Sequence, residues 1–213
     1  MKQLVHPIAI AMMLFALCST VAAQEKHQYN PEQFEKSERA EWQQVEKVIE
    51  ALKLKPGMRV ADIGGGSGYF SRPIAQAVGE QGVVYVCDLA TNLMEFLQAK
   101  AKEENLHNIV TVLAAMDRPM LPPKSVDLIF FCDTNHHLSN RVEYYKGLHS
   151  LLRKDGRIAV VDWKKKDQKV GPPASHNHAK EDMITEMKEA GFSAAREETF
   201  LDYQYFVFFE PTK

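Results

Sequence analysis

The sequence lacks an excess of charge of either sign. Its 213 residues include 26 lysines and arginines and 28 aspartates and glutamates, a formal net charge of −2 at pH 7. A nucleic-acid-binding protein would need a basic face, so no nucleic-acid partner is expected. Internal repeats and low-complexity segments are also missing, which argues against repeat architectures. With 45% hydrophobic and 25% charged residues, the composition is that of an ordinary globular protein.

The first 23 residues have the pattern of a secretion signal. A short, positively charged start precedes an unbroken apolar run over 8–17, and the small residues Val21 and Ala23 follow that run. We expect cleavage after Ala23 and export to the periplasm, with no stable membrane insertion afterwards. A lipoprotein site at Cys18 is disfavoured because the residue before the cysteine should be small. An uncleaved anchor would need about 20 apolar residues.

Cysteine is scarce, with three in the chain. Signal cleavage would remove Cys18 and leave Cys87 and Cys132. Both lie near the ends of predicted strands that should flank the first strand of a sheet on opposite sides. Strands two places apart are separated by roughly 9–10 Å, beyond the ~7 Å Cα limit for a disulfide. We therefore expect two buried free thiols.

Strands and helices alternate along the rest of the chain. Apolar residues at helical spacing predict a helix over 31–54, which the sequence Lys55-Pro56-Gly57 ends. Five strands and the helices between them predict a doubly wound, mostly parallel α/β sheet with helices on both faces. Two last strands with no helix between them must pair antiparallel, for seven in all. The predicted strands are 59–63, 83–87, 109–113, 126–132, 157–162, 194–199 and 203–209, and the later helices 69–78, 92–104, 141–152 and 179–190.

A glycine-rich turn between the first strand and its helix is the strongest motif. Residues 60–69 have the sequence VADIGGGSGY, with glycines at 64, 66 and 68. Such glycines permit a tight turn and let a ligand approach the backbone at a helix N-terminus. Asp88, at the tip of the second strand, could accept both hydrogen bonds from a ribose diol. Dinucleotide sites and S-adenosylmethionine sites share these features.

Several details of the sequence favour S-adenosylmethionine over a dinucleotide. The dinucleotide-binding fingerprint requires a glycine at the position that Tyr69 occupies. Asp62 would face a pyrophosphate unfavourably but suits a ligand that bears an ammonium group. Asp117 follows the third strand, where a side-chain acceptor could bind an adenine amino group. The antiparallel C-terminal pair is also not expected of a six-stranded dinucleotide domain.

On these residues, the chain from about Trp42 to Glu210 resembles the class I S-adenosylmethionine-dependent methyltransferases, near the small-molecule branch of ubiquinone and arsenite methyltransferases. The resemblance implies a Rossmann-like fold, S-adenosylmethionine as cofactor and a single domain over 24–213, with a helical segment 31–54 and a core 58–213. It implies that Asp62 and the glycines hold the methionine end, that Asp88 holds the ribose, and that Met116 and Asp117 border the adenine. The expected cofactor-binding residues are Asp62, Gly64, Gly66, Gly68, Tyr69, Asp88, Leu89, Met116 and Asp117.

The acceptor side rests on the segment that follows the fourth strand. Ligands of such folds bind outside the carboxyl ends of the strands, where this segment places Asp133, His136 and His137. Any of the three could act as general base toward an O-, N- or S-methyl acceptor. Alternatively, Asp133 and Thr134 shape the loop and one histidine caps the next element. Both interpretations stay open.

Histidines in the loop 171–178 invite a metal hypothesis, which the spacing does not support. His176 and His178 join His136 and His137, but none has the tight ligand spacing of a structural metal site on one regular element. No metal is expected. The pattern also departs from arsenite methyltransferases, because Cys87 and Cys132 fall within predicted strands. The aromatic-proline-amide motif of methyltransferases that act on DNA and protein is absent from the fourth-strand segment.

The sequence thus predicts methyl transfer from S-adenosylmethionine to an unidentified small-molecule acceptor. The protein would contribute mainly alignment and exclusion of water. Because S-adenosylmethionine is not expected to be plentiful outside the cytoplasm, the alternative is an exported non-catalytic ligand-binding protein built on the same fold. A nicotinamide oxidoreductase is disfavoured by Tyr69 and by the C-terminal strand pair.

Overall fold

The computed structural model describes residues 28–212 of the chain. The predicted secretion signal over 1–23 lies outside these residues, and so does Cys18. In the part of the chain that is described, no helix has both the length and the apolar character needed to span a membrane.

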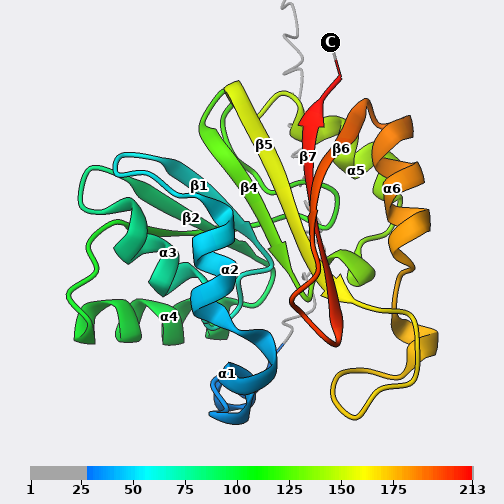
Figure 1. Cartoon of the computed structure of the whole chain (residues 1–213). Coiled ribbons are helices and arrows are strands. Elements are labelled where there is room, and N and C mark those ends of the chain that lie inside the picture. Colours follow the sequence, from blue (N-terminus) through cyan, green and yellow to red (C-terminus); the bar gives the residue numbers. More distant parts are fainter. Residues whose placement is uncertain (1–27, 213) are drawn as a thin grey trace, which may run out of the picture.

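Seven strands form one mixed sheet in the order β3-β2-β1-β4-β5-β7-β6 (Figure 1). Strands β1 to β5 pair in parallel, whereas β7 pairs antiparallel with both β5 and β6. The predicted Rossmann-like sheet with an antiparallel C-terminal strand is therefore confirmed. The strand order reverses between β1 and β4, and ligands of such folds bind outside the carboxyl ends of the strands at this point. The strands are β1 (Arg59–Ile63), β2 (Val83–Asp88), β3 (Ile109–Leu113), β4 (Val126–Cys132), β5 (Leu152–Trp163), β6 (Phe192–Glu198) and β7 (Gln204–Pro211).

Helices cover both faces of the sheet, as the alternation of elements predicts (Figure 1). The helices are α1 (Glu38–Gln43), α2 (Val45–Leu52), α3 (Ser71–Val78), α4 (Thr91–Glu103), α5 (Arg141–Leu148) and α6 (Lys180–Glu189), with short 3-10 turns η1 (Pro31–Phe34), η2 (Asn135–His137) and η3 (Ala174–His176). Residues of α2, α3 and α4 share one apolar core with the sheet, and residues of α5 and α6 share the other. Strand β4 is buried on both faces, since Phe130 belongs to one core and Phe131 to the other.

The two cysteines of the described chain are free and buried. Cys87 lies on β2 and Cys132 at the end of β4, and these strands flank β1 on opposite sides. The expectation of two separate buried thiols is confirmed.

The prediction of one continuous helix over 31–54 is wrong. The segment consists of η1, α1 and α2, and the break between the helices falls at Gln44, whose φ of 48° lies in the left-handed region. The Gln44 side chain donates a hydrogen bond to the backbone oxygen of Phe200 (2.9 Å). Tertiary hydrogen bonds of this kind redirect α1 across the end of the sheet, and helical periodicity does not reveal them.

The boundary between the fifth helix and its strand also differs from the prediction. The helix ends at Leu148 rather than Leu152, and β5 begins at Leu152 rather than Arg157. Leu152 already pairs with Val126 of β4, ahead of a register shift in the ladder. Pairing with the central strand therefore overrides the helical pattern at these residues.

No helix lies between β3 and β4 along the chain. Residues 114–125 connect the two strands as a loop, so part of the β3 edge is left without a covering helix. Four large apolar side chains are exposed along this edge and loop, namely Val110, Leu113, Met116 and Met120.

Two glycine substitutions should change stability in opposite directions. Gly68 has φ of +85°, and a Cβ there would collide with the side chain of Leu97 on α4. We expect Gly68→Ala to lower the free energy of unfolding by about 1–3 kcal/mol. Gly147 lies within α5, where an added methyl group would have no neighbour within 4 Å. Gly147→Ala should therefore raise the free energy of unfolding by about 0.5–1 kcal/mol.

Urea unfolding followed by circular dichroism measures both effects against the wild type. Equal stability of Gly68→Ala and wild type would contradict the tight packing of the turn against α4.

Candidate active site

The glycine turn is closely packed at Gly64 and less closely packed at Gly66. Gly64, Gly66 and Gly68 all have positive φ. A Cβ on Gly64 would collide with the side chain of Thr134, whereas a Cβ on Gly66 would have its nearest neighbour in Leu93, at 3.6 Å. Thr134 therefore excludes a side chain at Gly64, whereas the turn is less tightly packed at Gly66.

Asp88 ties the end of β2 to the glycine turn. One oxygen of its carboxylate accepts a hydrogen bond from the backbone N–H of Gly66 (2.9 Å), and the other accepts one from Ala90 (2.8 Å). A carboxylate has about four lone-pair sites, so further acceptor positions remain for a ligand hydroxyl. The Asp88 side chain is therefore held in place beside Gly66.

Asp62 is a buried acid beneath the same turn. It is 2% exposed, and the Ser71 hydroxyl donates a hydrogen bond to it (2.6 Å). Its pKa is raised to about 7, mainly by burial and also by the charge of Asp88, while the Ser71 hydrogen bond and the charge of Arg39 act in the opposite direction. A positively charged ligand group beside this carboxyl would stabilise its ionised form.

The turn that follows β3 lies next to Asp88. The backbone N–H of Ala114 donates to the Asp88 carbonyl (2.9 Å), and an Ala115–Arg118 bridge closes the turn. Met116 at its tip is 57% exposed, and the Asp117 side chain is 72% exposed. Both are thus accessible at the edge where the resemblance expects adenine. Leu89 packs against the core instead.

The N-terminal segment crosses the carboxyl ends of the strands, where Figure 1 shows α1 below the sheet. Glu35 accepts a hydrogen bond from the Ser67 hydroxyl of the glycine turn (2.6 Å) and pairs with Arg72. The Arg39 guanidinium lies 4.1 Å from the centre of the Tyr69 ring and 3.4 Å from the Asp133 carboxylate. This segment therefore joins the glycine turn to the end of β4.

Asp133 is enclosed by hydrogen-bond donors of the protein. It has φ of 56°, its side chain is 20% exposed, and it accepts hydrogen bonds from Gln43 (3.0 Å) and Gln204. Burial raises its pKa to about 6, against the charge of Arg39. Since both oxygens are bound by amide groups, this geometry favours the loop-shaping interpretation of Asp133 over the general base.

His136 pairs with an acid that the sequence reasoning did not single out. Its Nδ1 lies 2.7 Å from Oδ1 of Asp162, which is fully buried at the end of β5. The His137 ring lies beside that of His136 in a tilted arrangement, with ring centres 4.0 Å apart. Burial and the neighbouring His136 lower the pKa of His137. The two histidines therefore have different environments.

A sequence signal for Asp162 existed. Four parallel strands have an acid at or next to their carboxyl end, namely Asp62, Asp88, Asp133 and Asp162. By contrast, no local pattern marks Glu35, Arg39, Gln43 and Gln204, because they reach the site only through the folding of distant segments.

Two further aromatic residues and a loop histidine have structural partners. Tyr145 is fully buried, and its hydroxyl donates to Asn135. Trp42 packs on Trp163, with ring centres 5.0 Å apart. His178 lies 2.9 Å from Glu186, and among the described residues no group of three or more acidic, cysteine or histidine side chains could hold a metal ion.

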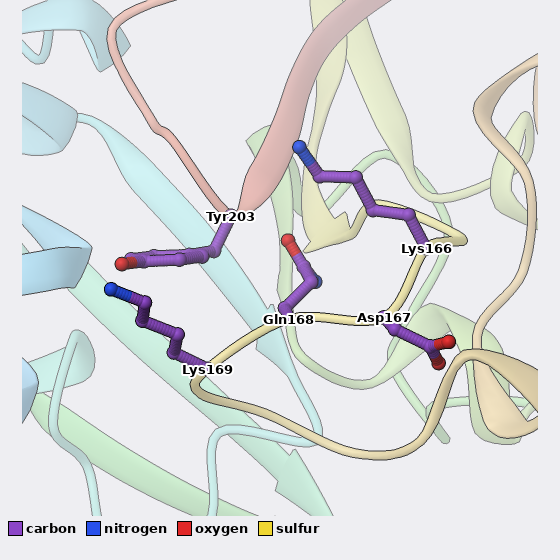
Figure 2. Close-up of a pocket in the computed structure, with 5 residues that line it drawn as sticks. All are labelled: Lys166, Asp167, Gln168, Lys169 and Tyr203. Atoms are coloured by element: carbon purple, nitrogen blue, oxygen red, sulfur yellow. The ribbon is translucent and has the colours of Figure 1, made fainter.

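An open pocket of about 430 Å³ lies on the loop after β5 and at the entrance to β7 (Figure 2). It is lined by Lys166, Asp167, Gln168, Lys169 and Tyr203. None of the sequence-predicted site residues lines it. The pocket therefore gives no support to a particular cofactor position.

Comparison with known proteins supports the class that this fold and site define. Residues 60–156 match a family described as a methyltransferase domain. A crystal structure of a SAM-dependent methyltransferase from Aquifex aeolicus is 26% identical, with a TM-score of 0.80 over 85% of this chain and 98% of that one. Together with the sheet topology, these matches support a relationship of this chain to the class I methyltransferase family.

Two curated relatives match shorter stretches. Aklanonic acid methyltransferase of a Streptomyces strain is 34% identical over 54% of this chain and 52% of its own length. A ubiquinone/menaquinone biosynthesis C-methyltransferase of a Shewanella strain is 21% identical over 58% of this chain and 49% of its own length. The chain thus spans about half the length of the curated relatives it matches.

The raised pKa of Asp62 gives a prediction for stability against pH. The folded protein retains a proton that the unfolded chain releases between pH 3.8 and about 7. The stability that comes from protonated Asp62 is therefore fully present below pH 3.8 and is lost as the pH rises toward about 7. In Asp62→Asn this loss should be absent. Relative to the wild type, the free energy of unfolding of the variant should therefore increase by on the order of 4 kcal/mol between about pH 4 and pH 8.

Urea unfolding across this pH range measures the difference. Asp167→Asn, which makes the same charge change on an exposed loop, is the matched control. Parallel pH profiles for wild type and Asp62→Asn would refute the assignment of the titrating group.

Proposed function

We propose that the protein transfers a methyl group from S-adenosylmethionine to a small-molecule acceptor. The observation that carries the proposal is the convergence of Asp62, Gly66 and Asp88 at the carboxyl ends of β1 and β2. Asp62 would pair with the ammonium group of the methionine end, and Asp88 would accept hydrogen bonds from the ribose. The relatives described above support the same cofactor.

The residues of the site fit this cofactor better than a dinucleotide. The turn is less tightly packed at Gly66 than at Gly64, since a Cβ on Gly66 would have no neighbour closer than 3.6 Å. Asp62 lies beneath the same turn, where the pyrophosphate of a dinucleotide would meet its carboxyl group unfavourably. An ammonium group would instead form an ion pair with Asp62, while Asp88 could bind the ribose of either ligand.

When bound, the cofactor supplies an activated methyl group on its sulfonium. The protein's part is to position the acceptor and to exclude water. Arg39 and Gln43 of α1 lie over the end of β4 and would limit the access of water there. The non-catalytic alternative has no specific observation in its favour, and it is retained only as an outcome of the test.

Binding of S-adenosylmethionine tests the cofactor assignment. Calorimetric titration should show binding of S-adenosylmethionine and of its demethylated product, but not of NAD. Asp88→Ala should weaken binding at least tenfold, because hydrogen bonds to a charged group contribute about 1.5–3 kcal/mol each.

Asp202→Ala, on the exposed turn before β7, serves as the control and should bind like the wild type. No binding by well-folded wild-type protein would refute the methyltransferase proposal and leave the non-catalytic alternative. Preferential binding of NAD would support an oxidoreductase.

We also propose that the protein is exported, with residues 24–213 as its single mature domain. The proposal rests on the apolar run over 8–17 and the small residues at Val21 and Ala23. N-terminal sequencing of protein from the periplasmic fraction of an expressing bacterium should give Gln24 as the first residue. Intact Met1 on protein confined to the cytoplasmic fraction would contradict it.

A further inference from the structure

Asp162 and His136 form a buried pair at the carboxyl edge of the sheet. Asp162 belongs to β5, and His136 lies in η2, four residues beyond the end of the neighbouring strand β4. Asp162 is fully buried, and the His136 side chain is 6% exposed. Two adjacent strands therefore deliver an acid and an imidazole to one point.

The hydrogen bonds of Asp162 determine which nitrogen of His136 carries the hydrogen. Its carboxylate accepts from the backbone N–H groups of His136 (2.8 Å) and Trp163 (2.8 Å). Its Oδ1 lies 2.7 Å from Nδ1 of His136. An ionised carboxylate only accepts hydrogen bonds, so Nδ1 is the donor and Nε2 of the neutral ring has a free lone pair.

Nε2 of His136 has no partner in the part of the protein that the structure describes and is not completely enclosed. It makes no hydrogen bond to any described residue, and it does not belong to the enclosed side-chain atoms that lack a partner. The backbone around it is fixed to the glycine turn, because the Thr134 hydroxyl donates to the carbonyl of Gly64 (3.2 Å). The free lone pair therefore lies in the segment that packs against the proposed cofactor site.

The surrounding charges favour a proton on His136. Burial lowers its pKa, but the hydrogen bond and charge of Asp162 and the charge of Asp133 outweigh burial and raise the pKa above 6.5. The other titratable groups nearby are His137, whose ring is tilted against that of His136, and Cys132, Tyr145 and Tyr205, which interact with Asp162 from β4, α5 and β7. Asp133 is held by Gln43 and Gln204, and His137 has no acidic partner within hydrogen-bonding distance among the described residues.

We propose that His136 is the general base of the methyl transfer, that Asp162 is its positioning residue, and that the acceptor atom is the oxygen of a phenol or enol. This inference rests on the proposed function. Asp162 would hold the ring so that Nε2 points toward the acceptor, and it would stabilise the imidazolium that forms.

The proton balance favours an acceptor that still carries its proton at neutral pH. The hydroxyl oxygen forms a bond to the methyl carbon, the carbon–sulfur bond breaks with its electron pair on sulfur, and the hydroxyl proton passes to Nε2 of His136. A carboxylic acid, with a pKa of about 4, is already ionised at neutral pH and needs no base. A phenol, with a pKa of about 10, is largely protonated and gains from one.

The first experiment examines the pair without any cofactor. In protein labelled with ¹⁵N-histidine, NMR should show His136 as the Nδ1–H tautomer with a pKa above 6.5, its signals identified by their loss in His136→Gln. Asp162→Asn should lower that pKa, and His149→Gln should leave it unchanged. An Nε2–H tautomer or a pKa below 6.5 in the wild type would overturn the pairing, whether or not Asp162→Asn folds.

The second experiment tests the acceptor with probes that share one ring. Phenol, catechol, benzoate, aniline and thiophenol, with acetylacetone as an enol, are offered together with S-adenosylmethionine. We expect methylation of a hydroxyl probe at a rate that rises with pH through the pKa of His136. His136→Gln should lower this rate at least about 100-fold with unchanged S-adenosylmethionine affinity, and Asp162→Asn should shift the pH profile to lower pH.

Preference for benzoate, aniline or thiophenol, or no transfer to any hydroxyl probe by protein that binds S-adenosylmethionine, would overturn the inference. So would full activity of His136→Gln. Failure to bind S-adenosylmethionine would instead refute the proposed function, while the NMR result on the pair would stand.

Discussion

The contact between Gly64 and Thr134 is the constraint on which the rest of the site depends. Gly64 begins the turn after β1, and Thr134 follows β4, the neighbouring strand. A side chain on Gly64 would occupy the space of Thr134, whose hydroxyl instead donates to the Gly64 carbonyl. This close approach joins the acids of β1 and β2 to the polar segment beyond β4. Both halves of the proposed reaction are thereby placed at one edge of the sheet.

The N-terminal segment stabilises the same junction from outside the sheet. The left-handed conformation of Gln44 turns α1 away from α2 and across the strand ends. From there Glu35 binds the glycine turn, while Arg39 and Gln43 bind Asp133. Asp133 consequently holds α1 in place, and His136 is left with its own acid, Asp162, on β5. Two acids of similar position in the sheet thus have different tasks.

Much of the fold could be predicted because it depends on local pattern. Apolar runs of strand length, alternating with helices, predicted the parallel sheet, and the missing helix before β7 predicted its antiparallel direction. The separation of Cys87 and Cys132 followed from strand order alone. The errors fall at 31–54 and 148–157, where hydrogen bonds to distant backbone, at Phe200 and in β4, override the local period.

For the site, the sequence by itself determined the glycine turn and the acids Asp62 and Asp88, because their spacing around one strand–turn–helix unit is encoded within about thirty consecutive residues. Only the tertiary structure decided the partners on the acceptor side. His136 meets Asp162, and Asp133 meets Gln43 and Gln204, across separations of 26, 90 and 71 residues. Hydrogen bonds between side chains so far apart depend on strand order and register, which no local pattern contains.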